Sequence, residues 1–394
     1  MSFLSRDVQD YRIGLLDGLM EQEELDAVVV FGAEFFQFFS NFHLDVLTWE
    51  RPVTLVLPRG GAPFALMNSL STNHLRMARE RQSMWVEDVT IYFEHPKPGV
   101  PLVGGFVELL AERLAACGLT GKRIGTDIAT PALAAAAARL DGASISNVQA
   151  GLRRLRWIKH AEELAIMREI ADLSDWVQDR YREQIRPGRL VQEMDLCIAA
   201  MMVEEAARRY PGENLEVLRC YTLSGPDSAS PHGNGAQTGA RVEAGHGLVN
   251  IVIPRLNGVT IENERVWFCG RPDATQTRHF ETARVAQEAA IEAMVAGRPV
   301  SGIDKAAREV FERDGCGDFI LHRTGHGMGL IGHEFPEDMP FNNRALLADE
   351  VYSAEPGIYV YGVGGFRFDD TVVIGERPEI LTRAPRDLRS QTVV

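Results

Sequence analysis

Two glutamates lie in a segment that otherwise has the composition of a buried hairpin. The run from Asn250 to Gly270 reads NIVIPRLNGVTIENERVWFCG, in which Asn257-Gly258 between β-branched stretches is a strong turn signal. Glu262 and Glu264 follow on the returning strand, where alternation points both side chains to one face with Cα atoms roughly 6–7 Å apart. Carboxylates this close repel each other unless a metal ion, protons or a cationic substrate neutralises them.

Further polar side chains gather in a few windows of the C-terminal half of the chain. His326 lies in a Gly-His-Gly sequence that allows the backbone to approach a ligand closely, and Glu355 precedes Pro-Gly after an alternating strand. One histidine alone is more often structural than functional, but the combination predicts a pocket at strand ends. The windows contain His232, His322, His326, His333, Glu355, Arg367, Asp369 and Asp370.

The elements that must position these residues form two patterns. In the C-terminal part, helical periodicity predicts helices near 161–184, 190–209, 276–296 and 302–314 around the antiparallel hairpin, an α+β arrangement. In the first part, apolar strands such as AVVVFG and VTLVLP alternate with helical stretches, as in an α/β domain. The change of pattern predicts two domains, 1–155 and 156–394.

Composition excludes several classes of partner. The chain has 394 residues and a formal net charge of -14, which disfavours nucleic acid and anionic membrane surfaces. No apolar run approaches the roughly 18 residues of a membrane helix. The five cysteines are widely spaced and include no CxxC pair, which fits a reducing cytoplasm. We therefore expect a cytoplasmic protein with no nucleic acid or membrane partner.

Three motifs give the chain a family resemblance. HRTGHGMGLIGHE, SAEPGIY and GGFRFDDTVV are similar to the successive histidine, glutamate and final acid motifs of the pita-bread superfamily, M24, which includes methionine aminopeptidase, aminopeptidase P, prolidase and creatinase. GLRRLRWIKHAEELAIMREIA resembles the opening helix of the catalytic domain in its prolidase and creatinase branch. The resemblance implies a C-terminal pita-bread catalytic domain after a smaller α/β creatinase/prolidase N-terminal domain.

The metal ligands of this family are only partly retained. Its peptidases hold two divalent metals with two aspartates of the hairpin, a histidine, a glutamate and a last glutamate. By resemblance, His326 and Glu355 match, whereas Glu262 and Asp369 replace an aspartate and a glutamate. The first aspartate position falls on Ile251 or on Asn250, and neither is an anion. The dimetal site is thus expected to be lost, although Glu262, His326, Glu355 and Asp369 could hold one divalent ion.

The departures resemble creatinase, the metal-free branch. There too an asparagine replaces the first aspartate, as Asn250 would here, and the hairpin reads Glu-Arg, as at Glu264-Arg265. The resemblance therefore implies that Asn250 and Arg265 bind substrate. The resemblance makes His232 the general base and acid, with His326 and His333 as its partners. It also implies that Glu355 binds a cationic nitrogen group and that Arg51 reaches the substrate carboxylate across a homodimer. Arg344 is a further candidate for that carboxylate.

The main functional expectation is a creatinase-like hydrolase that cleaves a C–N bond in a small zwitterionic, amino-acid-like substrate without a metal or other cofactor. The bond could be amidino, amide or cyclic amidine, with the cationic nitrogen centre among Glu262, Glu264, Glu355 and Asp369. One alternative is a mononuclear metal-dependent Xaa-Pro dipeptidase or lyase on the same fold. Another is a non-catalytic pita-bread binding protein.

Overall fold

The computed structural model describes residues 4–44, 50–232, 237–334 and 338–393. The chain divides into two compact units, one ending at Arg156 and the other beginning at Trp157, one residue from the division that the sequence predicts. Each unit has its own apolar core. None of the helices described is long and apolar enough to cross a membrane.

The N-terminal unit is an α/β domain around a mixed sheet of order β4-β3-β2-β1-β5-β6. Its strands are β1 (Ala27–Val30), β2 (Thr54–Pro58), β3 (Phe64–Asn68), β4 (Asp88–Tyr92), β5 (Arg123–Thr126) and β6 (Ser144–Asn147). Its helices are α1 (Arg6–Gln22), α2 (Ala33–Ser40), η1 (Ser69–Ser71), α3 (Thr72–Glu80), η2 (Val103–Gly105), α4 (Phe106–Ala116), α5 (Pro131–Ala137) and α6 (Gln149–Arg154). Val29, Leu66 and Ile124 on three strands pack with Leu110 of α4 in its core.

The C-terminal unit has the predicted α+β arrangement, with a sheet of order β11-β14-β10-β8-β7. Its strands are β7 (Leu215–Ser224), β8 (Gly247–Leu256), β9 (Val259–Thr260), β10 (Asn263–Cys269), β11 (Val351–Ala354), β12 (Gly357–Val360), β13 (Gly364–Arg367), β14 (Asp369–Val373), β15 (Glu379–Ile380) and β16 (Thr392–Val393). Its helices are α7 (Ala161–Gln184), α8 (Val191–Arg209), η3 (Gly225–Ala229), α9 (Ala274–Ala293), α10 (Ser301–Arg313), η4 (Gly317–Phe319) and η5 (Met339–Phe341).

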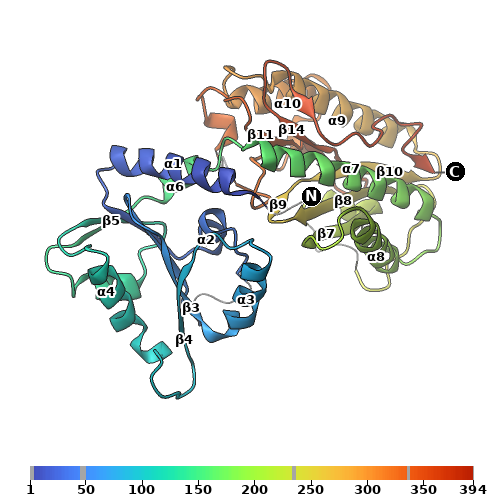
Figure 1. Ribbon diagram of the computed structural model, residues 1–394. Helices are drawn as coiled ribbons and strands as arrows, with labels where there is room; N and C mark the ends of the chain where they lie inside the picture. Colours follow the sequence, from blue (N-terminus) through green and yellow to red (C-terminus); the bar gives the residue numbers. More distant parts are fainter. Residues whose placement is uncertain (1–3, 45–49, 233–236, 335–337, 394) are drawn as a thin grey trace. The chain divides into compact units, whose positions relative to one another are not determined.

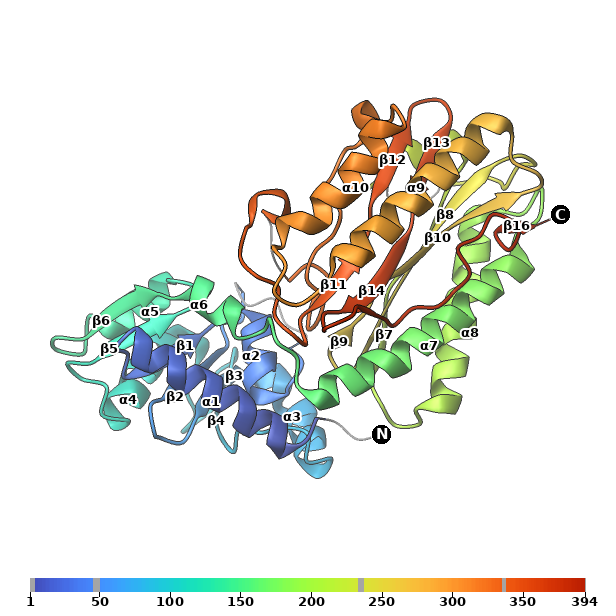
Figure 2. The same ribbon diagram turned by 90° about the horizontal axis from the view of Figure 1, so that it is seen from above.

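Two helix pairs cover the faces of this sheet. Figures 1 and 2 show α7 and α8 on one side of β8 and β10, and α9 and α10 on the other. Trp267 donates a hydrogen bond to Gln178 of α7, whereas Val249 and Val266, on the other face, pack in one core with α9 and α10. Because side chains alternate along a strand, residues of β8 and β10 divide between these two layers.

The hairpin forms at the predicted turn. Asn257 and Gly258 have φ angles of 50° and 83°, the left-handed values that a two-residue type I′ turn requires at both positions. Leu256 pairs with Val259 next to this turn, and the same register continues to the pair of Ile251 with Glu264. The turn therefore fixes which residues of β8 face the carboxylates of β10.

Candidate active site

One row of paired residues crosses four strands and brings the site together. Tyr221 of β7 pairs with Ile251 of β8, Ile251 with Glu264 of β10, and Glu264 with Asp369 of β14. Directly paired residues of a sheet point to the same face. Glu262, two residues before Glu264, points the same way, as the sequence predicts. The row thus places Glu262, Glu264 and Asp369 in one carboxylate cluster beside Ile251.

The loop before β11 adds a histidine and β11 leads to a fourth acid. The backbone N–H of His326 donates to Ser353 Oγ at 3.0 Å, and Ser353 N–H donates to the His326 carbonyl at 2.8 Å. Glu355 N–H donates to the Thr324 carbonyl at 2.6 Å, and Asp304 of α10 accepts both the N–H and the hydroxyl of Thr324. These backbone hydrogen bonds place His326 and Glu355 beside the carboxylate cluster.

Several atoms at the centre of the cluster lack hydrogen-bond partners among the described residues. His326 Nε2 lies 3.6 Å from Glu262 Oε2 and 3.4 Å from Glu355 Oε2, separations of ion pairs rather than of good hydrogen bonds. His326 Nε2, Glu262 Oε2 and both carboxylate oxygens of Asp369 are buried and have no hydrogen-bond partner in the described part of the chain. Ligand atoms of His326, Glu355 and Asp369 lie within 4.8 Å of one another. Such a donor set suits a divalent cation.

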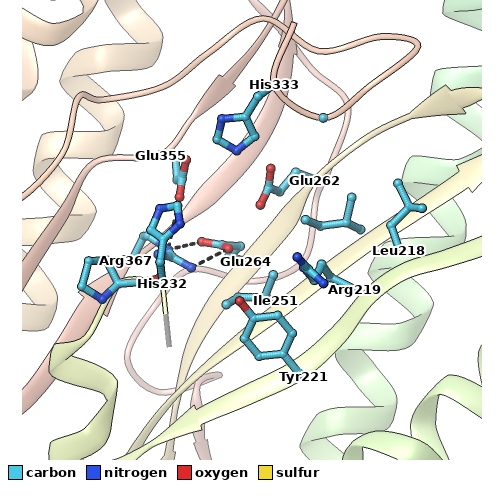
Figure 3. A pocket seen from close by; sticks show the side chains of 13 residues that line it. Leu218, Arg219, Tyr221, His232, Ile251, Glu262, Glu264, His333, Glu355 and Arg367 are labelled. Atoms are coloured by element: carbon cyan, nitrogen blue, oxygen red, sulfur yellow. Dashed lines mark hydrogen bonds and ion pairs between the residues drawn. The ribbon is translucent and has the colours of Figure 1, made fainter. Parts of the chain in front are cut away.

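Arg367 supplies the internal positive charge of the site. Its guanidinium makes a two-pronged pair with Glu264, with Nη2 donating to Oε1 at 2.7 Å, and its Nε lies 3.4 Å from Glu355 Oε1 (Figure 3). Nη1 donates to the Pro231 carbonyl at 2.8 Å and to the Tyr359 hydroxyl at 3.2 Å. The Tyr359 hydroxyl is 2.6 Å from His322 Nε2. Every nitrogen of Arg367 is therefore used inside the protein.

Burial and mutual repulsion perturb the acids of the cluster. Burial, together with neighbouring carboxylates, raises the pKa of Glu262 and of Asp369 well above the usual range. Burial also raises the pKa of Glu264 to about 7 against the opposing charge of Arg367. Burial alone would raise the pKa of Glu355, but His326 and Arg367 lower it. A cluster with these properties favours protons or a bound cation.

A cavity of about 600 Å³ opens onto this cluster, a volume within the range of small-molecule sites. His333 lines it, and its ring stacks on that of His326 with centroids 3.7 Å apart. Burial and His326 lower the pKa of His333 to about 4, so its imidazole is neutral at pH 7. The lining comprises Leu218, Arg219, Tyr221, Pro231, His232, Ile251, Ile253, Glu262, Glu264, Gly332, His333, Glu355 and Arg367 (Figure 3).

The predicted catalytic residues meet around this cavity. His232, Glu262, Glu264, His333 and Glu355 line it. His326 and Asp369 belong with Glu262 and Glu355 to the groups that could hold a metal ion. Their roles stay predictions.

The expectations for Asn250 and Arg265 are corrected by the register. Arg265 pairs with Asn250, one position away from the pair of Glu264 with Ile251, so both point to the α7 face. The Asn250 amide donates to Thr222 Oγ1 at 2.6 Å, and Arg265 forms a buried ion pair with Asp370 at 2.7 Å. Neither side chain lines the cavity. Ile251, the other candidate for the first aspartate position, does.

The two remaining arginines are held by other acids. Arg344 pairs with Glu350 at 2.7 Å, and its guanidinium lies 3.8 Å from the centre of the Trp157 ring, so the expected contact with a substrate in this cavity is also corrected. Arg51 belongs to the N-terminal unit, where it pairs with Glu94 at 2.8 Å. Its contribution to the site of a second subunit stays a prediction.

Three polar side chains of the site were not predicted from the sequence: Arg219, Tyr221 and Tyr359. Arg219 and Tyr221 lie two residues apart on β7. Because the pairing of β7 with β8 was not predicted, the sequence did not show that their side chains share the sheet face of the carboxylates. Tyr359 follows the Glu-Pro-Gly motif, and its partners Arg367 and His322 come from other windows.

The chain belongs to metallopeptidase family M24. The model of this family matches residues 165–376, and the creatinase/prolidase N-terminal domain matches residues 12–158. The superfamily, its fold and the two kinds of domain that the sequence predicts are thereby confirmed. Membership makes the chain a hydrolase of C–N bonds, the enzyme class expected from its motifs.

Several relatives of the chain are named as dipeptidases. The probable dipeptidase PepE of Mycobacterium tuberculosis (strain ATCC 25618 / H37Rv) is 30% identical over 338 residues, 84% of this chain and 82% of the relative. The Xaa-Pro dipeptidase of Pyrococcus furiosus is 30% identical over 238 residues, 60% of this chain and 66% of the relative. The crystal structure of dipeptidase PepE from Mycobacterium ulcerans superposes with a TM-score of 0.81, 25% identity and full coverage of both chains.

Proposed function

We propose that this chain is a metal-dependent dipeptidase whose site holds one divalent cation with Glu262, His326, Glu355 and Asp369. The observation that carries the proposal is the set of buried, unpartnered donor atoms on Glu262, His326 and Asp369. Buried polar groups without partners are costly, and a cation placed among them would satisfy them together. The geometry and the relatives thus support the metal-dependent alternative more than the metal-independent creatinase-like reading.

One cation, rather than two, fits the residues present. A dinuclear site needs bridging carboxylates on both sides of two ions about 3.5–4 Å apart. Ile251 faces Glu264 where such a carboxylate would be needed. Both oxygens of Glu264 are already engaged by Arg367. The guanidinium therefore takes part of the charge-neutralising role of a second metal.

A cation bound here would supply Lewis acidity for the peptide carbonyl and lower the pKa of water. The chain's own groups do the rest. His333, neutral at pH 7, can exchange hydrogen bonds with substrate in the cavity. His232 follows Pro231, whose carbonyl accepts from Arg367, so Arg367 also orients the loop that carries this histidine. We assign to His232 proton transfer to the leaving nitrogen.

The test combines metal analysis with hydrolysis of Ala-Leu, Leu-Leu, Ala-Pro and Leu-Pro. We expect about one bound divalent ion per chain, and activity that chelation abolishes and Mn²⁺, Zn²⁺ or Fe²⁺ restores. Asp369→Asn should lose the ion and at least about a hundredfold in kcat/KM, because even changes behind a metal ligand cost about 10–100-fold. The matched control is Glu376→Gln at an exposed position, which should retain both.

A metal-independent hydrolase of a cationic, amidino-type substrate is the second candidate. The observation in its favour is that a guanidinium, that of Arg367, already lies against Glu264 and Glu355. Full activity after exhaustive chelation, in protein without bound metal, would reject the dipeptidase proposal and favour this candidate.

A further inference from the structure

A dipeptide carries a free carboxylate that the acidic cluster cannot bind, so the cavity must offer a positive charge elsewhere. Arg219 and Arg367 are the arginines among its lining residues. All three nitrogens of Arg367 are engaged by Glu264, Pro231 and Tyr359. Arg219 remains as the permanent charge available to an anion.

Arg219 forms no ion pair with the acidic residues that the structure describes. Its guanidinium carbon lies 6.0 Å from the centre of the Tyr221 ring, and no carboxylate of the described ranges forms an ion pair with it. The side chain is exposed at the edge of the cavity. An arginine presents a planar fork of donors that matches both oxygens of a carboxylate.

A bulge in β7 brings two neighbouring residues to the same wall. Val217 pairs with Pro254 and Arg219 with Ile253, so Leu218 is an extra residue in the strand. Bulges re-aim side chains and occur often beside active sites. Arg219, Tyr221 and Ile253 share the sheet face of the carboxylates, while the bulge lets Leu218 line the cavity too. Figure 3 shows this wall across the cavity from Glu355 and His232.

We propose that Arg219 determines specificity by binding the free carboxylate of the C-terminal residue of the dipeptide. The apolar side chain of that residue then lies against Leu218, Tyr221 and Ile253. The cleaved bond faces the cluster of Glu262 and Glu355 on the other side of the cavity. This inference rests on the proposed function, and it makes a free acid a better substrate than the corresponding amide.

The kinetic test uses the fastest of the four dipeptides and its C-terminal amide. Loss of a charge-assisted pair in Arg219→Gln should raise KM for the free acid by about ten- to a hundredfold, with kcat and the KM of the amide nearly unchanged. Arg219→Lys, which keeps the charge without the fork, should recover part of the loss. Arg271→Gln, the same charge change at an exposed position, is the matched control. If Arg219→Gln discriminated between the free acid and the amide as strongly as the wild type does, the inference would be overturned.

A binding measurement separates this inference from the proposed function. Calorimetric titration with L-leucine and with L-leucinamide should show that wild-type protein prefers the free acid and that Arg219→Gln does not. If the wild type hydrolyses none of the dipeptides, the proposed function fails, and this titration alone decides the role of Arg219. Equal preference for L-leucine in wild type and Arg219→Gln would then overturn that role.

Discussion

At residue 251 an apolar side chain lies directly against the carboxylate cluster. Ile251 pairs with Glu264 across the hairpin and is 2% exposed. An anion at this position would add the oxygens that a second cation needs on this side. One residue away, Asn250 points to the opposite face and hydrogen-bonds Thr222. In the proposed metal site, the residue at position 251 therefore limits the number of cations together with Arg367, which engages both oxygens of Glu264.

Ile251→Asp should create a second cation site. We expect the bound divalent metal, measured by mass spectrometry of the purified protein, to rise from about one to about two ions per chain. After chelation the new acid is buried beside Glu264 without a partner, so the variant should lose about 3–5 kcal/mol of stability in urea unfolding. Added Mn²⁺ or Zn²⁺ should restore this loss.

The matched control is Asn250→Asp. Its carboxylate would lie on the far face, near Thr222 and the buried Asp195, which accepts from the Thr222 hydroxyl at 2.6 Å. We expect no gain of metal and a loss of stability that Mn²⁺ does not restore. A gain of metal in Asn250→Asp but not in Ile251→Asp would refute the register on which the site is built.

At the scale of elements, helices and turns are predicted well when many neighbouring residues contribute to the same sequence pattern. The helix expected near 161–184 is α7, which begins with a capping box between His160 and Glu163, and the other three long helices end within three residues of expectation. The Asn257-Gly258 pair likewise predicted the turn of the hairpin. Sequence could not choose between Asn250 and Ile251, because a shift of one residue moves a side chain to the other face. The pairing of β7 with β8 and of β10 with β14, which completes the site, joins residues far apart in the sequence.

The loop that carries His333 is held by a buried ion pair. Glu334 Oε1 accepts from the Leu330 N–H at 2.6 Å, and its Oε2 lies 3.4 Å from Lys159 Nζ. Lys159→Met should cost about 3–5 kcal/mol in urea unfolding, because it removes a positive partner of a buried carboxylate. His333 should be displaced with the loop, so kcat should fall as well.

The double variant Lys159→Met/Glu334→Gln tests that explanation. A neutral amide oxygen can still accept from Leu330, whereas neither charge of the pair remains, so most of the lost stability should return. A double variant no more stable than Lys159→Met would show that packing of the lysine stem, and not charge, holds the loop.

At the scale of the whole molecule, the functional residues are unequally divided between the two units. Every residue that lines the cavity belongs to the unit that begins at Trp157. Arg51 belongs to the other unit, so the prediction that it binds substrate in a second subunit requires a homodimer. Arg51 and Arg219 need not compete, because the two oxygens of a carboxylate offer about four acceptor positions and two arginines can share them.

Mixing two inactive subunits tests the shared site. If Arg51 serves the partner subunit, Arg51→Ala and His232→Ala are defective in complementary parts of each site, and a heterodimer contains one site in which both residues are intact. Random reassociation makes half of the dimers heterodimers, so activity should recover to about a quarter of that of wild type. Each variant reassociated with itself is the control and should stay inactive. Recovery absent from a mixture whose heterodimers are demonstrated by differential tagging would show that Arg51 does not serve the site of a second subunit, and Arg219 would then bind the carboxylate without help from that subunit.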